Sequence, residues 1–251
     1  MQDWEKALYK FLKKYKNKSY FEGALLCGSY ATGNQNKFSD IDVHILISDS
    51  QNWRERGNVK VDGFLMEYFI NPIKQIRKEF QGDVARGRVH CSNMFAYGQI
   101  LFDKNGYVEQ LQKEADKFFK KPLPKYARSD IAFDLYGIWT LMDELRSLLS
   151  EKKALGLAYN NLLENLMLLY FKVNQIPKIS LTKIEKILST PKFAKRYHIQ
   201  KLPDKKFTKL FLDALQKQDV KSIQKLYDFV IDSVGGFDIE TFKIKSKLKD
   251  K

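Results

Sequence analysis

The sequence predicts an α+β fold: a domain with a mixed sheet flanked by helices, followed by an α-helical bundle domain. Short apolar runs separated by glycine, asparagine and aspartate occur in the first half of the chain, a pattern typical of strands joined by turns. After the lysine- and proline-rich segment at residues 120–124, apolar residues recur almost only at helical spacing. We therefore predict two domains, residues 1–121 and residues 122–251.

Strand-like runs and stretches of helical spacing are mixed in the first domain. The predicted strands are residues 23–27, 41–47, 58–61, 64–70 and 99–102, and the predicted helices are residues 2–16 and 73–80. Asp62 and Gly63 tolerate positive φ, which favours a two-residue hairpin between the third and fourth strands. Asn71 and Pro72 are expected to end the fourth strand.

The second domain is predicted to be all-helical. Residues 131–145 carry one apolar stripe, and residues 155–173 are apolar on most sides, as expected of a helix at the centre of a bundle. Shorter helices are predicted at residues 184–188, 207–215 and 223–234, with Gly235 and Gly236 closing the last of them.

The chain is strongly basic, with 44 Lys and Arg residues against 30 Asp and Glu and a net charge of +14. Such an excess suits a polyanionic partner such as RNA or a nucleotide. The alternative is a solvated surface, because the lysines are spread along the chain and lack interleaved aromatic residues. The lysines of the C-terminal tail are Lys243, Lys245, Lys247, Lys249 and Lys251.

The composition favours a globular protein of the cytoplasm. With 44% hydrophobic residues, the 251-residue chain can bury a substantial core. Cys27 and Cys91 are expected to be reduced, and the N-terminus lacks the apolar stretch of a secretory signal. The longest apolar run, residues 162–171, is broken by Glu164 and Asn165 and is too short to span a bilayer. We expect no membrane association.

Two motifs near the N-terminus point to one chemistry. Gly28 follows the first predicted strand, where the chain can turn tightly, and Ser29 begins a segment whose backbone N–H groups can hold phosphate. Asp40 and Asp42 are two residues apart at the second strand, so their side chains point to the same face. Two adjacent carboxylates beside a phosphate site suit Mg²⁺, which completes its shell with phosphate oxygens and water.

These motifs resemble those of the nucleotidyltransferase superfamily, which includes DNA polymerase β, poly(A) polymerases, and aminoglycoside and lincosamide nucleotidyltransferases. The shared signature is an apolar residue, Gly-Ser, a spacer of about ten residues and Asp-apolar-Asp-apolar. The resemblance implies that Asp40 and Asp42 ligate Mg²⁺, with two ions in the site, and that Ser29 contacts the phosphates of ATP or another nucleoside triphosphate. Ser39 and Lys37 are further expected nucleotide-binding residues, along with Gly28; the alternative for Lys37 is a solvated loop charge.

A third acidic residue is part of the same signature, and Glu67 is the candidate. It lies in the middle of the fourth predicted strand among apolar residues, where a carboxylate is costly to bury without a partner. A metal or a substrate hydroxyl would be such a partner. The alternative is an edge strand with Glu67 facing water. Asp62 is the weaker candidate, because the turn explains it.

The remaining polar residues have competing explanations. His44 continues the face of Asp40 and Asp42, but a hydrogen-bonded structural histidine is the simpler expectation. Glu164, in the apolar central helix, is either a base on the acceptor side or half of a structural ion pair. The weaker candidates are Asp143 and Glu144 for that base, Arg54 for phosphate binding, and His90 with Cys91, which lack companions for a zinc site.

The predicted reaction is phosphoryl-type transfer at the α-phosphate, in a cleft between the two domains. Three acceptors are considered. A small hydroxylated molecule, such as an aminoglycoside or lincosamide antibiotic, is favoured by the resemblance in domain layout. An RNA 3′ end is favoured by the net charge of +14. A toxin–antitoxin-type module that binds or modifies a protein is the third possibility.

Overall fold

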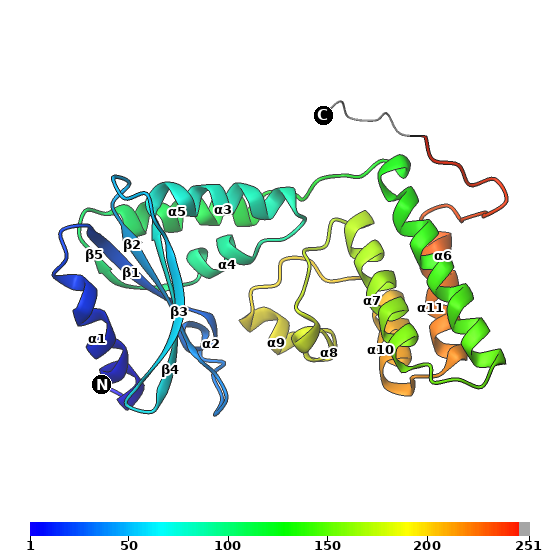
Figure 1. Cartoon of the computed structure of the whole chain (residues 1–251), viewed down its shortest axis with the longest axis horizontal. Coiled ribbons are helices and arrows are strands. Elements are labelled where there is room, and N and C mark those ends of the chain that lie inside the picture. The colour runs from blue at the N-terminus through cyan, green and yellow to red at the C-terminus, as the bar shows by residue number, and fades with distance from the viewer. Residues whose placement is uncertain (246–251) are drawn as a thin grey trace. The chain divides into compact units, whose positions relative to one another are not determined.

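The computed structural model describes residues 1–245, so Lys247, Lys249 and Lys251 of the basic tail lie outside the described residues. The chain forms two compact units (Figure 1). The first contains Met1–Pro122 and Lys192–Gln200, and the second contains Leu123–Pro191 and Lys201–Lys251. No helix within the described part of the chain is both long and apolar enough to cross a membrane.

The first unit is built on a five-stranded sheet with strand order β3-β4-β2-β1-β5. The strands are β1 (Phe21–Cys27), β2 (Ile41–Ile47), β3 (Glu55–Val61), β4 (Phe64–Pro72) and β5 (Gln99–Asp103). Strands β2 and β4 pair in parallel, while the other neighbouring pairs are antiparallel. The sheet is therefore mixed, as predicted.

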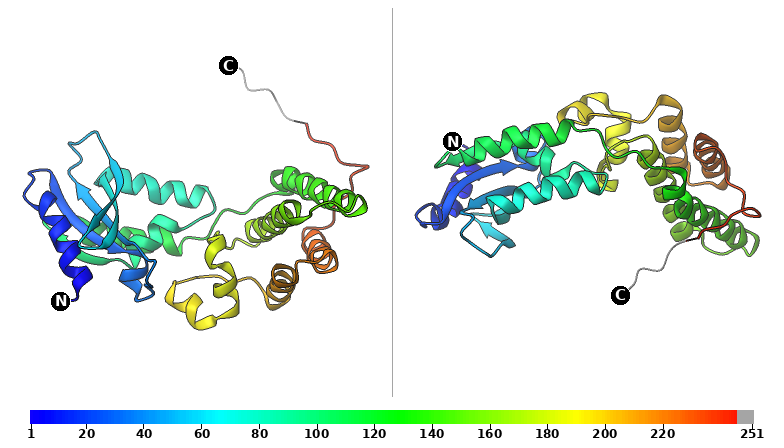
Figure 2. Two further views of the ribbon diagram at one scale, coloured as in Figure 1. Left: turned by 60° about the horizontal axis from the view of Figure 1, so that its bottom comes forward. Right: turned by 90° about the horizontal axis from the view of Figure 1, so that it is seen from above.

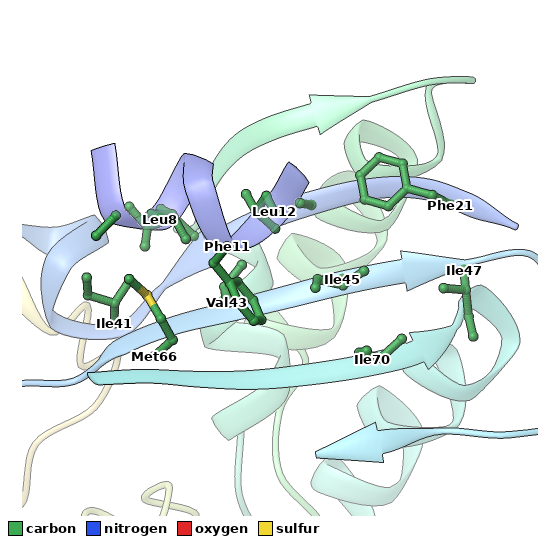
Figure 3. Packing of buried hydrophobic residues seen from close by; sticks show 13 residues of the cluster. Leu8, Phe11, Leu12, Phe21, Ile41, Val43, Ile45, Ile47, Met66 and Ile70 are labelled. Carbon is green, nitrogen blue, oxygen red and sulfur yellow. The ribbon is translucent and has the colours of Figure 1, made fainter. Parts of the chain in front are cut away.

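Helices cover both faces of this sheet (Figure 2). They are α1 (Asp3–Lys16), α2 (Gly28–Thr32), α3 (Ile73–Ala85), α4 (His90–Ala96) and α5 (Tyr107–Lys120). On one face, Leu8 and Phe11 of α1 pack in a cluster with Val43 and Ile45 of β2 (Figure 3). On the other face, Leu46 joins the apolar side chains of α3, α4 and α5. The alternation of side chains along β2 thus supplies both cores.

The sequence missed or shortened several elements of the first unit. Helices α4 and α5 were not predicted, α3 continues to Ala85, and β3 begins at Glu55. Strand β3 is an edge strand whose side chains are mostly exposed, so it lacks the apolar run that marks a buried strand. The hairpin turn is confirmed, because Asp62 and Gly63 both have positive φ, +49° and +87°.

The second unit contains helices and no strand among its described residues. Its elements are α6 (Arg128–Ser150), α7 (Gly156–Val173), α8 (Leu181–Ser189), α10 (Lys205–Lys217) and α11 (Val220–Ser233), with Pro191 of α9 (Pro191–Arg196). At the end of α11, the N–H groups of Gly235 and Gly236 donate to Asp232 and Ile231. The predicted α+β fold, with a mixed sheet followed by a helical region, is confirmed.

One segment beyond the predicted boundary packs with the first unit. Residues Lys192–Gln200 belong to that unit, although they follow α8 in the chain. The amide of Asn93 donates to the carbonyl oxygen of Tyr197 at 3.3 Å, and the ring of Tyr97 stacks on His198 with 3.5 Å between centroids. A single division of the chain between residues 121 and 122 therefore does not account for residues Lys192–Gln200.

Candidate functional site

The parallel pairing of β2 and β4 brings the predicted carboxylates together. Asp42 lies beside Glu67 in the strand register, and side chains of register neighbours point to the same face of a sheet. Asp40 directly precedes β2. One carboxylate oxygen from each residue lies within 4.8 Å of the others, and all three residues are half-buried. Asp40, Asp42 and Glu67 thus form a single acidic cluster.

This donor set fits a divalent cation. Three carboxylates this close together repel one another, and a bound cation relieves that repulsion. Hard oxygen ligands from two or three acidic residues, with room left for water and phosphate oxygens, are what Mg²⁺ takes in phosphoryl-transfer sites. The alternative that Glu67 sits on an edge strand is wrong, because β4 has β2 on one side and β3 on the other.

Gly28 lies against the carboxylate of Asp42. Its φ of +66° is in the left-handed region, and a Cβ placed on it would stand 1.9 Å from Asp42 Oδ2. The sequence analysis attributed this glycine to close approach of the backbone to phosphate. The structure adds a different reason: only glycine leaves room for the Asp42 carboxylate at the end of β1.

The segment from α2 to β2 contains the other predicted nucleotide-binding residues. Ser29 is in the first turn of α2. The hydroxyl oxygen of Ser39 accepts from the backbone N–H of Asn36 at 2.9 Å, which holds the loop just before Asp40. Lys37 is exposed, with its Nζ 4.8 Å from the ring centroid of Phe38. Phe38 itself is 85% exposed, two residues before Asp40.

His44 is buried behind the carboxylates rather than exposed beside them. Its ring stacks on Phe69 at 4.8 Å between centroids and meets the edge of Phe95 at 4.9 Å. Burial lowers the pKa of His44 to about 3, with a smaller contribution from His90. The expectation of a hydrogen-bonded histidine is wrong, because neither ring nitrogen has a hydrogen-bond partner among residues 1–245.

Arg56 is a site residue that the sequence analysis missed. Its Nη2 and Nε both donate to Glu67 Oε1, at 2.5 and 3.2 Å, and its guanidinium lies over the ring of Phe69 at 4.7 Å. The predicted strand began at residue 58, so Arg56 was left in a loop. Polar residues alternate with smaller or apolar ones here, a pattern typical of a strand. Arg56, Asn58 and Lys60 are exposed, while Gly57 and Val59 are less exposed.

The part of the chain that contains this site is similar to a known protein family. Residues 7–105 match the family model described as polymerase beta, nucleotidyltransferase. The matched stretch contains all five strands, the Gly28 turn and the acidic cluster. The first unit is a nucleotidyltransferase-like domain. This match supports the resemblance to the nucleotidyltransferase superfamily.

Among solved structures, the chain is similar to a nucleotidyltransferase-like protein from Exiguobacterium sibiricum 255-15, with 12% sequence identity and a TM-score of 0.40. The alignment covers 92% of this chain and 80% of that chain. No curated protein sequence matches the chain. The nucleotidyltransferase-like character of the first unit therefore depends on its sheet, its acidic cluster and the match over residues 7–105.

Several weaker candidates are not members of the acidic cluster of the nucleotidyltransferase-like domain. Asp62, in the hairpin turn, pairs with Lys10 at 2.6 Å. Arg54 pairs with Glu79 of α3 at 3.5 Å, and the backbone N–H of Cys91 donates to Asp83. Glu164 is half-buried on α7 of the second unit, and the exposed Asp143 and Glu144 are on α6.

Proposed function

We propose that the protein is a Mg²⁺-dependent nucleotidyltransferase that moves a nucleoside monophosphate from ATP or another nucleoside triphosphate to an acceptor hydroxyl. The observation that carries this proposal is the convergence of three carboxylate oxygens within 4.8 Å in a domain matched by a nucleotidyltransferase family model. In the reaction, the acceptor oxygen bonds to the α-phosphorus. The bond from that phosphorus to the bridging oxygen breaks, and pyrophosphate leaves.

Each residue of the cluster has a role in this proposal. Asp40 and Asp42 would hold Mg²⁺, which when bound neutralises charge on the phosphate oxygens. Glu67 would either ligate a second ion or take the proton from the acceptor hydroxyl. Gly28 has no side chain, so it leaves room for the Asp42 carboxylate.

Residues around the cluster would bind the two substrates. Ser29, Ser39 and Lys37 are proposed to contact the nucleotide, because they lie in the segment between the Gly28 turn and Asp40. Glu164 of the second unit is the alternative base on the acceptor side. We propose residues 1–121 as the catalytic domain and residues 122–251 as the helical domain, apart from Lys192–Gln200, which belongs to the first unit.

We propose a small hydroxylated acceptor of the aminoglycoside or lincosamide type, which would make the protein an antibiotic-resistance enzyme. This follows from the resemblance in layout: a nucleotidyltransferase-like domain followed by a helical region. The second candidate is an RNA 3′ end, which the net charge of +14 favours because phosphate backbones bind to basic surfaces. Binding of RNA would weaken steeply as salt is raised.

The test is a transfer assay with α-labelled nucleoside triphosphates and Mg²⁺. Acceptor panels would contain aminoglycosides, lincosamides, RNA oligonucleotides and a protein extract, with Asp42→Asn as the inactive control. Label in a small-molecule product supports the first candidate, and label in RNA supports the second. Label in protein would instead indicate a protein-modifying enzyme. Nucleotide binding without any labelled product would contradict the proposed transfer.

A further inference from the structure

The guanidinium group of Arg56 bonds directly to the acidic cluster. Both donors of Arg56, Nη2 and Nε, meet the same oxygen of Glu67, Oε1. The Glu67 side chain is 18% exposed, whereas the Arg56 side chain is 68% exposed. The guanidinium thus reaches the cluster from solvent and neutralises one of its three negative charges.

This ion pair is placed to compete with a metal ion. An arginine and a divalent cation repel each other when both approach the same carboxylate, here that of Glu67. The Arg56 partner is 68% exposed, so water can solvate the guanidinium when a bound ion displaces it from Glu67. The contact is therefore an exchangeable one.

Arg56 has a second contact on the sheet besides Glu67. It is the register partner of Phe69 in the neighbouring strand, and Phe69 and Glu67 point to the same face because they are two residues apart. The ring of Phe69 supports the guanidinium at 4.7 Å.

We propose that Arg56 is an exchange residue that binds Glu67 in the nucleotide-free protein and the triphosphate in the loaded protein. The inference rests on the proposed nucleotidyltransferase function. Glu67 would hold a metal ion together with Asp40 and Asp42, and the guanidinium of Arg56 would then be free to bind phosphate oxygens, which suit its planar fork. The same arginine thus opposes metal binding before the nucleotide arrives and favours nucleotide binding afterwards.

The test measures two affinities with opposite expected changes. Mn²⁺ binding without nucleotide is followed by electron paramagnetic resonance, and inorganic tripolyphosphate binding in the presence of Mg²⁺ is followed by calorimetry. Arg56→Gln should bind Mn²⁺ about threefold to fivefold more tightly, because a competing cation is lost. It should bind tripolyphosphate about tenfold more weakly, because a charge-assisted contact is lost. Arg54→Gln, which changes the same charge but pairs with Glu79, should change neither affinity by more than about twofold.

Each other outcome overturns the inference. An unchanged Mn²⁺ affinity in Arg56→Gln excludes the competition, and an unchanged tripolyphosphate affinity excludes the exchange. Arg56→Lys, which keeps the charge but loses the fork, should show smaller changes in both directions; a lysine variant that behaves like glutamine would contradict the role of charge. Wild-type protein that shows no Mn²⁺ binding sensitive to Asp42→Asn would overturn the metal site itself, and the proposed function with it.

Discussion

Gly28→Ala is expected to damage the acidic cluster without unfolding the protein. The new Cβ would stand 1.9 Å from Asp42 Oδ2, so the carboxylate must move by more than about 1 Å to reach an ordinary contact distance. The positive φ of +66° adds backbone strain of about 1–2 kcal/mol for any residue with a side chain. Because a displacement of this size in a catalytic group lowers rates by about 100-fold, turnover should fall by that factor.

Gly33→Ala is the matched control. Gly33 has nearly the same φ, +67°, but a Cβ there would meet no atom of residues 1–245 within 4 Å. Both variants should lose free energy of unfolding from the positive φ, and Gly28→Ala should lose at least as much as Gly33→Ala in urea denaturation because of its additional clash. Only Gly28→Ala should also lose Mn²⁺ affinity and nucleotide transfer. Equal losses of metal affinity in the two variants, or wild-type transfer by Gly28→Ala, would refute the proposed contact between Gly28 and the metal ligand.

Five further substitutions test the roles of single residues. Asp40→Asn and Asp42→Asn should each abolish Mg²⁺-dependent transfer while thermal unfolding stays the same or rises slightly, because the carboxylates repel one another without metal; a variant with wild-type turnover would exclude that aspartate as a ligand. Glu67→Gln should lower kcat more than it weakens nucleotide binding. Asp62→Asn should change neither quantity. Steady-state kinetics on the two variants would contradict these roles if Asp62→Asn lowered kcat more than Glu67→Gln. His44 should make the protein less stable as pH falls from 6.5 towards 3, because the unfolded chain takes up a proton that the folded protein, with its pKa of about 3, does not. Between pH 6.5 and 5, the His44→Phe variant should therefore lose about 2 kcal/mol less free energy of unfolding than the wild type. Urea denaturation at these two pH values measures both losses, and equal losses in variant and wild type would count against a buried neutral imidazole.

Local sequence patterns predicted the parts of the fold that depend on one segment. The period-two alternation of β2 placed Asp40 and Asp42 on one face, and the turn chemistry of Asp62 and Gly63 placed the hairpin. Glu67 was predicted to share their face because its burial would otherwise be costly. The parallel pairing of β2 with β4 supplies the reason, and that pairing joins segments with no local signal in common.

The features that the sequence did not predict depend on contacts between segments that are distant in the chain. Strand β3 lies at the edge of the sheet, so its outward residues carry no apolar pattern, and Arg56 could not be connected to Glu67 before the register was known. The crowding of Gly28 against Asp42 likewise comes from the end of one strand lying beside the start of another. The return of Lys192–Gln200 to the first unit is a long-range contact of the same kind.

The most direct test of the central claim is an anomalous difference map from crystals of the protein soaked in MnCl₂. The account predicts a manganese peak at about 2 Å from carboxylate oxygens of Asp40 and Asp42, with Glu67 ligating the same ion or a second one beside it. Crystals of Asp42→Asn treated in the same way should lack the peak. Manganese bound elsewhere in the wild-type crystals, with none at Asp40 and Asp42, would contradict the proposal that this cluster is the metal site of a nucleotidyltransferase.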